Sequence, residues 1–190
     1  MGGRLRSLSA VAALAVLALA AVPASGNQQE LEAYGGLWQY ADGDEGRQEI
    51  EVAIGRAIDD LPFFVEPFAA DQIRPITTPF ERVRFTVTGD RLAFLADGWG
   101  PVSSRVGGPP ETIRDPVGSP LELQQSMRGS RLKQVFTSPD GQRENIFALS
   151  GDGRWIWMSV RISSPRLPAD VRYRLRYRRA DTAPTQHATR

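Results

Sequence analysis

Residues 171–178 read VRYRLRYR, an alternation of apolar or aromatic residues with arginine. Successive side chains of a β-strand point to opposite faces of a sheet, so this pattern predicts a strand with one buried and one solvated face. The solvated face would carry a row of four arginines: Arg172, Arg174, Arg176 and Arg178. We therefore expect a sheet whose last strand faces a core on one side and water on the other.

Similar segments precede this strand and are separated by turn residues. The predicted strands cover residues 83–87, 91–96, 121–127, 131–137, 143–149 and 154–162. Residues 97–120 are rich in glycine and proline, which leaves room there only for short edge strands. The pattern predicts a mainly β protein of about eight antiparallel strands in chain order, and such a meander removes its exposed edges by closing into a barrel. A β-sandwich is the alternative.

A helical segment, residues 46–73, comes before the strands. From Asp44, a candidate N-cap, apolar residues recur at helical spacing up to Pro62, which should end the first helix and open a second. The second piece contains Phe63, Phe64 and Phe68, which we expect to be covered. One or two short N-terminal helices should thus pack against the barrel. They would also cover the outward side chains of the strand over residues 154–162.

The first 24 residues predict export. Arg4 and Arg6 precede an apolar run over residues 10–22, and Val22-Pro23-Ala24 offers small residues for cleavage, as in a signal peptide. The run is shorter than the roughly 20 residues of a membrane-spanning helix, so no span should remain after cleavage. We expect a periplasmic or secreted protein, and the single lysine among 23 basic residues is typical of GC-rich bacterial coding. The mature chain would comprise a flexible lead-in (residues 25–35), one domain (residues 36–180) and a disordered tail (residues 181–190).

Composition disfavours several classes of function. Without cysteine the chain has neither disulfides nor thiol chemistry, and its one histidine, His187, lies in the predicted tail, which disfavours Ser-His-Asp catalysis and zinc sites. Residues 42–46 resemble the start of a calcium loop, but Arg47 and Ala53 replace residues that such a loop needs. We expect no catalytic residues, metal or cofactor, and a net charge near zero favours no nucleic acid.

Charge is distributed unevenly along the chain. Residues 25–80 hold 11 acids and 3 bases, whereas residues 154–190 hold 2 acids and 9 bases. The two ends could attract each other within the fold, or the basic end could face an anionic partner.

Gly36-Leu37-Trp38, just ahead of the meander, resembles the Gly-x-Trp motif that opens the barrel of lipocalins and related calycins. The resemblance implies that Trp38 closes one barrel end and that an arginine after the last strand, Arg178 or Arg179, lies across it. The chain departs from that family in placing helices between the motif and the first clear strand. It is also similar to short exported bacterial proteins of unknown function.

The resemblance favours a non-enzymatic, monomeric binding protein for a small apolar or amphipathic ligand. The inward residues that could line its site are Phe85, Phe94, Phe136, Phe147, Met158, Tyr173 and Tyr177. The alternative is a solid-core structural or interaction barrel whose arginine row contacts an anionic component of the cell envelope.

Overall fold

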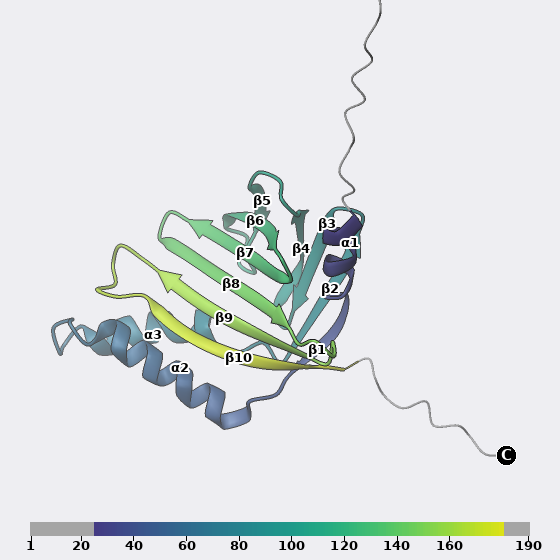
Figure 1. The fold of residues 1–190 in the computed structure, drawn as a ribbon. Coiled ribbons are helices and arrows are strands. Elements are labelled where there is room, and N and C mark those ends of the chain that lie inside the picture. Colours follow the sequence, from purple (N-terminus) through teal and green to yellow (C-terminus); the bar gives the residue numbers. More distant parts are fainter. Residues whose placement is uncertain (1–24, 181–190) are drawn as a thin grey trace, which may run out of the picture.

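The computed structural model describes residues 25–180, which form one ten-stranded antiparallel sheet and three helices (Figure 1). The helices are α1 (Ser25–Glu32), α2 (Gly43–Ile58) and α3 (Glu66–Thr77). The strands are β1 (Gly36–Tyr40), β2 (Arg82–Thr88), β3 (Arg91–Ala96), β4 (Trp99–Arg105), β5 (Glu111–Arg114), β6 (Pro120–Arg128), β7 (Arg131–Ser138), β8 (Gly141–Leu149), β9 (Trp155–Ser163) and β10 (Val171–Arg179). The predicted signal peptide and tail, with His187, lie outside the described residues. None of these three helices is long and apolar enough to cross a membrane.

The first and last strands lie side by side, and this closes the sheet into a barrel. The strand order is β4-β3-β2-β1-β10-β9-β8-β7-β6-β5, with every neighbouring pair antiparallel. Trp38 of β1 pairs with Val83 of β2 on one side and with Arg179 of β10 on the other. The predicted mainly β meander barrel is therefore confirmed, and the sandwich is excluded.

A gap remains between β4 and β5, and a buried glutamine side chain spans it. Backbone pairing across the gap is limited to a bridge between Val106 and Gln125, where Gly107 N also donates to Gln125 O (2.7 Å). The Gln125 amide is fully buried and donates to Leu92 O (2.8 Å) and Ser104 Oγ (3.0 Å). One side chain thus joins β6 to β3 and β4 inside the barrel.

Outside the barrel, Glu111 makes a second connection across the same gap. Its carboxylate accepts two hydrogen bonds from the Arg91 guanidinium (3.2 and 2.7 Å) and one from Arg105 N (2.8 Å). The hydrogen bonds from Arg91 and from Arg105 N hold the pKa of Glu111 below its ordinary value. Since a lowered pKa in the folded state means that folding favours the ionised carboxylate, this contact stabilises the fold when Glu111 is charged.

We expect the Glu111→Gln variant to be less stable than the wild type at pH 7 and to approach it in acid. The stabilisation is complete above roughly pH 5, where an unfolded-state glutamate (pKa about 4.3) is ionised, and is lost as the pH falls through the lowered folded-state pKa. Urea unfolding of both proteins between pH 7 and pH 3 checks this. A difference in unfolding free energy that does not change with pH would contradict it.

The N-terminal segment is not a flexible lead-in. Residues 25–32 form α1, which lies at the end of the barrel opposite α2 and α3 (Figure 1). Both Leu31 and Tyr34 are buried. The Tyr34 hydroxyl donates to Ser130 O (2.5 Å) and accepts from Leu132 N (3.3 Å). The polar sequence of residues 25–35 gave no sign of this packing, because Leu31 and Tyr34 are too few to form an apolar period.

Helix α2 packs along the free side of β10, and acidic side chains bind the strand's exposed backbone. Because β1 ends at Tyr40, the first half of β10 has no neighbouring strand on the side of β1. Two backbone N–H groups on this side donate to carboxylates instead: Arg174 N to Glu49 Oε1 (3.0 Å) and Arg176 N to Asp42 Oδ2 (2.5 Å). The buried face of α2 includes the predicted Ile50, but the N-cap is Asp42 rather than Asp44. The acidic front and basic end of the chain therefore do meet within the fold.

The second helix begins later than predicted. Residues 62–65 form a turn, and α3 starts at Glu66 with Pro67 in its first turn, where a missing N–H costs little. This leaves Phe63, Phe64 and Phe68 exposed, so the expectation that they are covered was wrong.

The outward tryptophans of β9 lie beneath arginines instead of helices. The Arg176 guanidinium lies 5.1 Å from the Trp155 ring centre, and that of Arg174 lies 5.5 Å from the Trp157 ring centre. Both tryptophans stay partly exposed. Helix α2 packs along the edge of β10 and α3 lines the barrel mouth, so the predicted helical cover of β9 was misplaced.

Candidate ligand-binding cavity

A cavity of about 880 Å³ opens between α3 and the end of the barrel. Its walls come from α3, from the inward faces of several strands, and from the β5–β6, β7–β8 and β9–β10 connections. Most lining side chains are apolar, among them Phe68, Ile73, Phe94, Trp99, Phe136 and Leu167. The barrel is thus hollow at the end that α3 covers.

Two aromatic pairs line this cavity. Phe80, which follows α3, meets Phe94 edge-on with ring centres 5.8 Å apart. Trp99 of β4 meets Phe136 of β7 in the same way at 5.4 Å. Such edge-to-face pairs stabilise a fixed ring arrangement, so the walls are set by the fold without a ligand.

Arg143 places a guanidinium in this apolar setting. It projects inward from β8, lines the cavity, and lies 5.5 Å from the Phe80 ring centre. It donates to Asn145 Oδ1 (3.0 Å) and to Ile76 O (2.5 Å). Among residues 25–180 no carboxylate forms an ion pair with Arg143. The cavity lining therefore includes a partly buried guanidinium that is held by carbonyl and amide oxygens rather than by a carboxylate of residues 25–180.

A buried polar row continues from Arg143 across the barrel interior. Asn145 of β8, Gln134 of β7 and Gln125 of β6 are register neighbours, and all three are buried. Gln134 donates to Gln125 Oε1 (2.8 Å), while its own Oε1 is buried without a partner. Buried amides normally satisfy both groups, so this acceptor marks a position suited to an internal water molecule.

Two of the residues predicted to line a ligand site, Phe94 and Phe136, line this cavity. The others pack outside its lining: Phe85, Phe147, Met158, Tyr173 and Tyr177. All five are buried, and Phe85 meets Phe147 edge-on at 5.1 Å, so these side chains pack against the rest of the core. For these five residues a direct role toward a ligand stays a prediction.

The two buried tyrosines of β10 are held as neutral phenols. Tyr173 Oη donates to Thr77 O (3.3 Å) at the end of α3, whereas Tyr177 Oη is buried without a partner. Burial raises the pKa of both hydroxyls above its ordinary value. Neither group can act as a base near neutral pH, and residues 25–180 contain no cluster of three His, Cys, Asp or Glu side chains suited to a metal ion.

Sequence reasoning missed Arg143, Trp99 and the lining face of α3. A signal for Arg143 was present, because it alternates with Asn145 and Phe147 and must share their inward face. Trp99 lies in the glycine-rich region where strand register could not be assigned. The sequence predicted that the second helix starts at Pro62, four residues before the start of α3 at Glu66, so the face of α3 that lines the cavity was not identified.

Trp38 and Arg179 meet at the closed end of the barrel. The Trp38 side chain is fully buried, its Nε1 donates to Tyr34 O (2.9 Å), and the Arg179 guanidinium lies 4.1 Å from its ring centre. Arg179 also donates to Gly35 O (2.7 Å), Ala33 O (2.6 Å) and Gly153 O (2.8 Å). Gly36 opens β1, whereas Arg178, the other residue proposed for this contact, points outward and is exposed.

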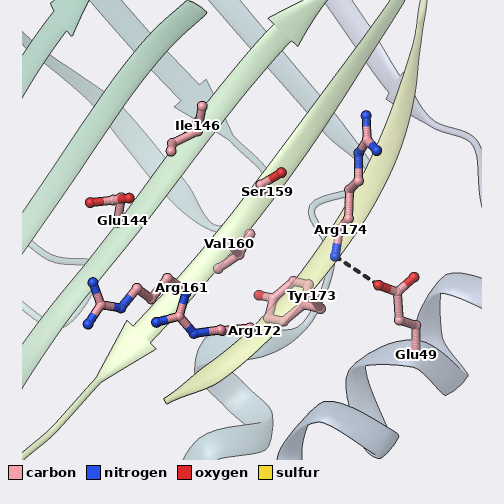
Figure 2. Close-up of a pocket in the computed structure, with 9 residues that line it drawn as sticks. All are labelled: Glu49, Glu144, Ile146, Ser159, Val160, Arg161, Arg172, Tyr173 and Arg174. Carbon is pink, nitrogen blue, oxygen red and sulfur yellow. Dashed lines mark hydrogen bonds between the residues drawn. The ribbon is translucent and has the colours of Figure 1, made fainter.

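The arginine row lies on the outer wall, and two of its members, Arg172 and Arg174, line an open groove of about 360 Å³ (Figure 2). Arg161 and Arg172 both bind Asp170 (2.7 Å each), and Arg176 binds Asp42 (3.1 Å). Arg174 extends along the wall over Trp157 while its backbone N–H binds Glu49. Most of the row is thus engaged by the chain's own acids and aromatic rings.

No protein-family model matches this chain, and no curated protein matches its sequence. Solved structures do share its architecture: fatty-acid-binding protein 1 of Echinococcus granulosus aligns over 78% of this chain and 98% of its own, with 13% identity and a TM-score of 0.50. This chain has the fatty-acid-binding-protein fold. A secretary abundant heat soluble (SAHS) protein of Ramazzottius varieornatus aligns over 78% of this chain and 96% of its own, with 12% identity and the same TM-score.

The fatty-acid-binding-protein fold refines the lipocalin-like expectation. The structure is a meander barrel, as predicted, but it has ten strands where about eight were expected. Helices α2 and α3 lie between β1 and β2, which was the feature that set the sequence apart from lipocalins.

Proposed function

We propose that this protein binds a small apolar or amphipathic ligand in the cavity beneath α3. The observation that carries the proposal is a preformed, mainly apolar cavity of about 880 Å³. Cavities of roughly 300–1,000 Å³ with a few polar groups among apolar side chains are typical of small-molecule sites. The likeness to solved structures supports a barrel able to hold such a ligand, while the ligand class rests on the cavity's own chemistry.

Arg143 supports an amphipathic ligand with an anionic group. A guanidinium in an apolar cavity is costly unless a charge partner is present, and carboxylate, sulfonate and phosphate groups suit its planar donors. The apolar part of the ligand would contact Phe94, Phe136 and Trp99, and its anionic group would approach Arg143 and Asn145.

We further propose that the protein acts outside the cytoplasm as a non-enzymatic carrier. Support for export comes from the signal-peptide pattern of residues 1–24. Support for binding without catalysis comes from the composition of the cavity, where the titratable lining residues are Asp115, Asp140, Arg143 and Arg166. Asp140 is paired with Arg166 (2.7 Å) at the mouth, so these groups do not form an acid–base pair around a reacting atom.

Two dyes that differ in charge test the site. Anilinonaphthalene sulfonate is apolar and anionic, whereas N-phenyl-1-naphthylamine is apolar and neutral. We expect both dyes to bind with increased fluorescence, and Arg143→Met to weaken the anionic dye about tenfold while the neutral dye changes little. Ala69→Phe, which adds a ring to the cavity wall on α3, should weaken both dyes.

The matched control is Arg154→Met, which removes an exposed arginine at the closed end of the barrel. It should leave both titrations unchanged. Absence of binding by both dyes, or equal binding by the wild type and the Ala69→Phe variant, would contradict the proposed site.

The alternative function is contact between the outer arginine row and an anionic envelope component. It rests on Arg174 and Arg178, whose guanidinium groups form no ion pair within residues 25–180. Arg174 lies over Trp157, and this stacking leaves the in-plane N–H groups free to bind an anion. The cavity carries the primary proposal because α3 and six strands supply its lining residues, whereas the arginine row is the face of one strand.

A further inference from the structure

Three phenylalanines near the tip of the helical pair form an exposed patch, which we call the phenyl patch (Phe63, Phe64 and Phe68). Their exposed fractions are 84%, 64% and 73%. Phe63 and Phe64 meet edge-on with ring centres 5.6 Å apart, so the turn presents them together. Contiguous exposed aromatic surface is uncommon in soluble domains and marks interaction sites.

The phenyl patch is continuous with the rim of the cavity. Phe68 belongs to both, and two further exposed apolar residues, Ile76 (51%) and Val117 (86%), also line the cavity. Leu61 and Val65, which flank Phe63 and Phe64 in the chain, line it as well. Figure 1 shows the turn between α2 and α3 projecting beyond the strands at this end of the barrel. Apolar surface thus runs from the protruding tip to the cavity interior.

The charges around the phenyl patch are acidic. Asp59 and Asp60 precede it, Glu66 lies within it and Asp71 follows it, and residues 57–73 contain no lysine or arginine. Arg74, the next base, is already bound to Asp71 (2.8 Å) and Glu51 (3.3 Å). An anionic surface would be repelled here, whereas an electrically neutral apolar phase would not.

We propose that the phenyl patch docks the cavity mouth on a zwitterionic lipid bilayer, with Phe63 and Phe64 entering its interface. Aromatic side chains suit this depth of a membrane, and two buried rings provide reversible attachment. A ligand could then pass between bilayer and cavity along apolar surface. Ligand transfer of this kind rests on the proposed function, whereas the docking itself does not.

A second copy of the chain fits the patch less well. Two facing patches would bring two acidic rims together, and like charges in contact oppose association. The bilayer avoids this cost because its headgroups carry no net charge.

Flotation of the full chain with phosphatidylcholine vesicles tests the proposal. We expect wild-type protein to float with the vesicles, and the Phe63→Ser/Phe64→Ser variant to partition at least about tenfold less. Leu95→Ser is the matched control, since Leu95 is an exposed apolar residue (39%) on β3 and away from the patch. It should float as the wild type does.

Lipid charge and dye binding separate the remaining explanations. Adding phosphatidylglycerol should weaken flotation, and salt should restore it; flotation that requires phosphatidylglycerol would overturn the proposal and implicate the arginine row. Equal flotation of the wild type and the double variant would also overturn the proposal, since another segment, such as residues 10–22, would then bind the vesicle. The double variant should bind both dyes normally, because neither ring lines the cavity. If the wild type bound neither dye, the proposed carrier function would be contradicted, whereas the proposed membrane docking would not.

Discussion

Replacing Trp38 by alanine is expected to lower the free energy of unfolding by roughly 3–5 kcal/mol, the cost of truncating a buried aromatic residue. Trp38 is the largest fully buried side chain and also contributes to the pairing of β1 with both β2 and β10. Its loss removes the indole hydrogen bond to Tyr34 O (2.9 Å) and the surface on which Arg179 stacks (4.1 Å). A drop of about 2 M in the urea midpoint would follow for a domain of this size.

Trp157→Ala is the matched control for this substitution. Trp157 also lies beneath an arginine, Arg174, but on the outer wall, where it is partly exposed. Its truncation should cost clearly less. Equal midpoints for the wild type and the Trp38→Ala variant would show that the Gly-x-Trp motif has no closing role in this barrel.

Gln125→Leu should destabilise the protein by roughly 2–4 kcal/mol although leucine has nearly the same volume. The substitution leaves Leu92 O, Ser104 and the Gln134 amide buried without their partner, and each unsatisfied group costs about 1–3 kcal/mol. The effect should be concentrated at the gap, so hydrogen exchange of the β4 and β6 amides should accelerate more than that of β9 and β10.

Gln124→Leu provides the comparison, because Gln124 is the neighbouring residue on the exposed face of β6. A surface substitution of this kind changes stability by about 0.5 kcal/mol or less. If both leucine variants unfolded at the same urea concentration, the buried amide would have no special role in joining the two sides of the gap.

Local pattern was sufficient to predict most of the barrel. The alternation in residues 171–178 and the turn at residues 138–141 identify strands whose inward and outward faces the structure confirms. What the pattern could not supply was pairing between distant segments. The five residues of β1 are too few for a clear period, yet their position between β2 and β10 decides that the sheet closes.

The candidate site was harder to predict for a physical reason. Large inward aromatic residues such as Phe85 and Phe147 look alike in sequence whether they fill a core or line a cavity. In this barrel Phe85 and Phe147 are part of the core. Which side chains of α3 line the cavity depends on where this helix starts, and its start is set by the turn at residues 62–65 and by Pro67. Arg143 was the more informative residue, since a charge at an inward position requires an explanation that a phenylalanine does not.

The seam between β1 and β10 also sets the order of events during folding. It joins residues near the start of the folded domain to those near its end, as in the contact of Arg179 with Gly35, 144 positions apart. Contacts of such separation form slowly and cannot form until nearly the whole domain has been synthesised. A nascent chain therefore stays open along this line until its last strand is available, and the proposed export would require such an open state.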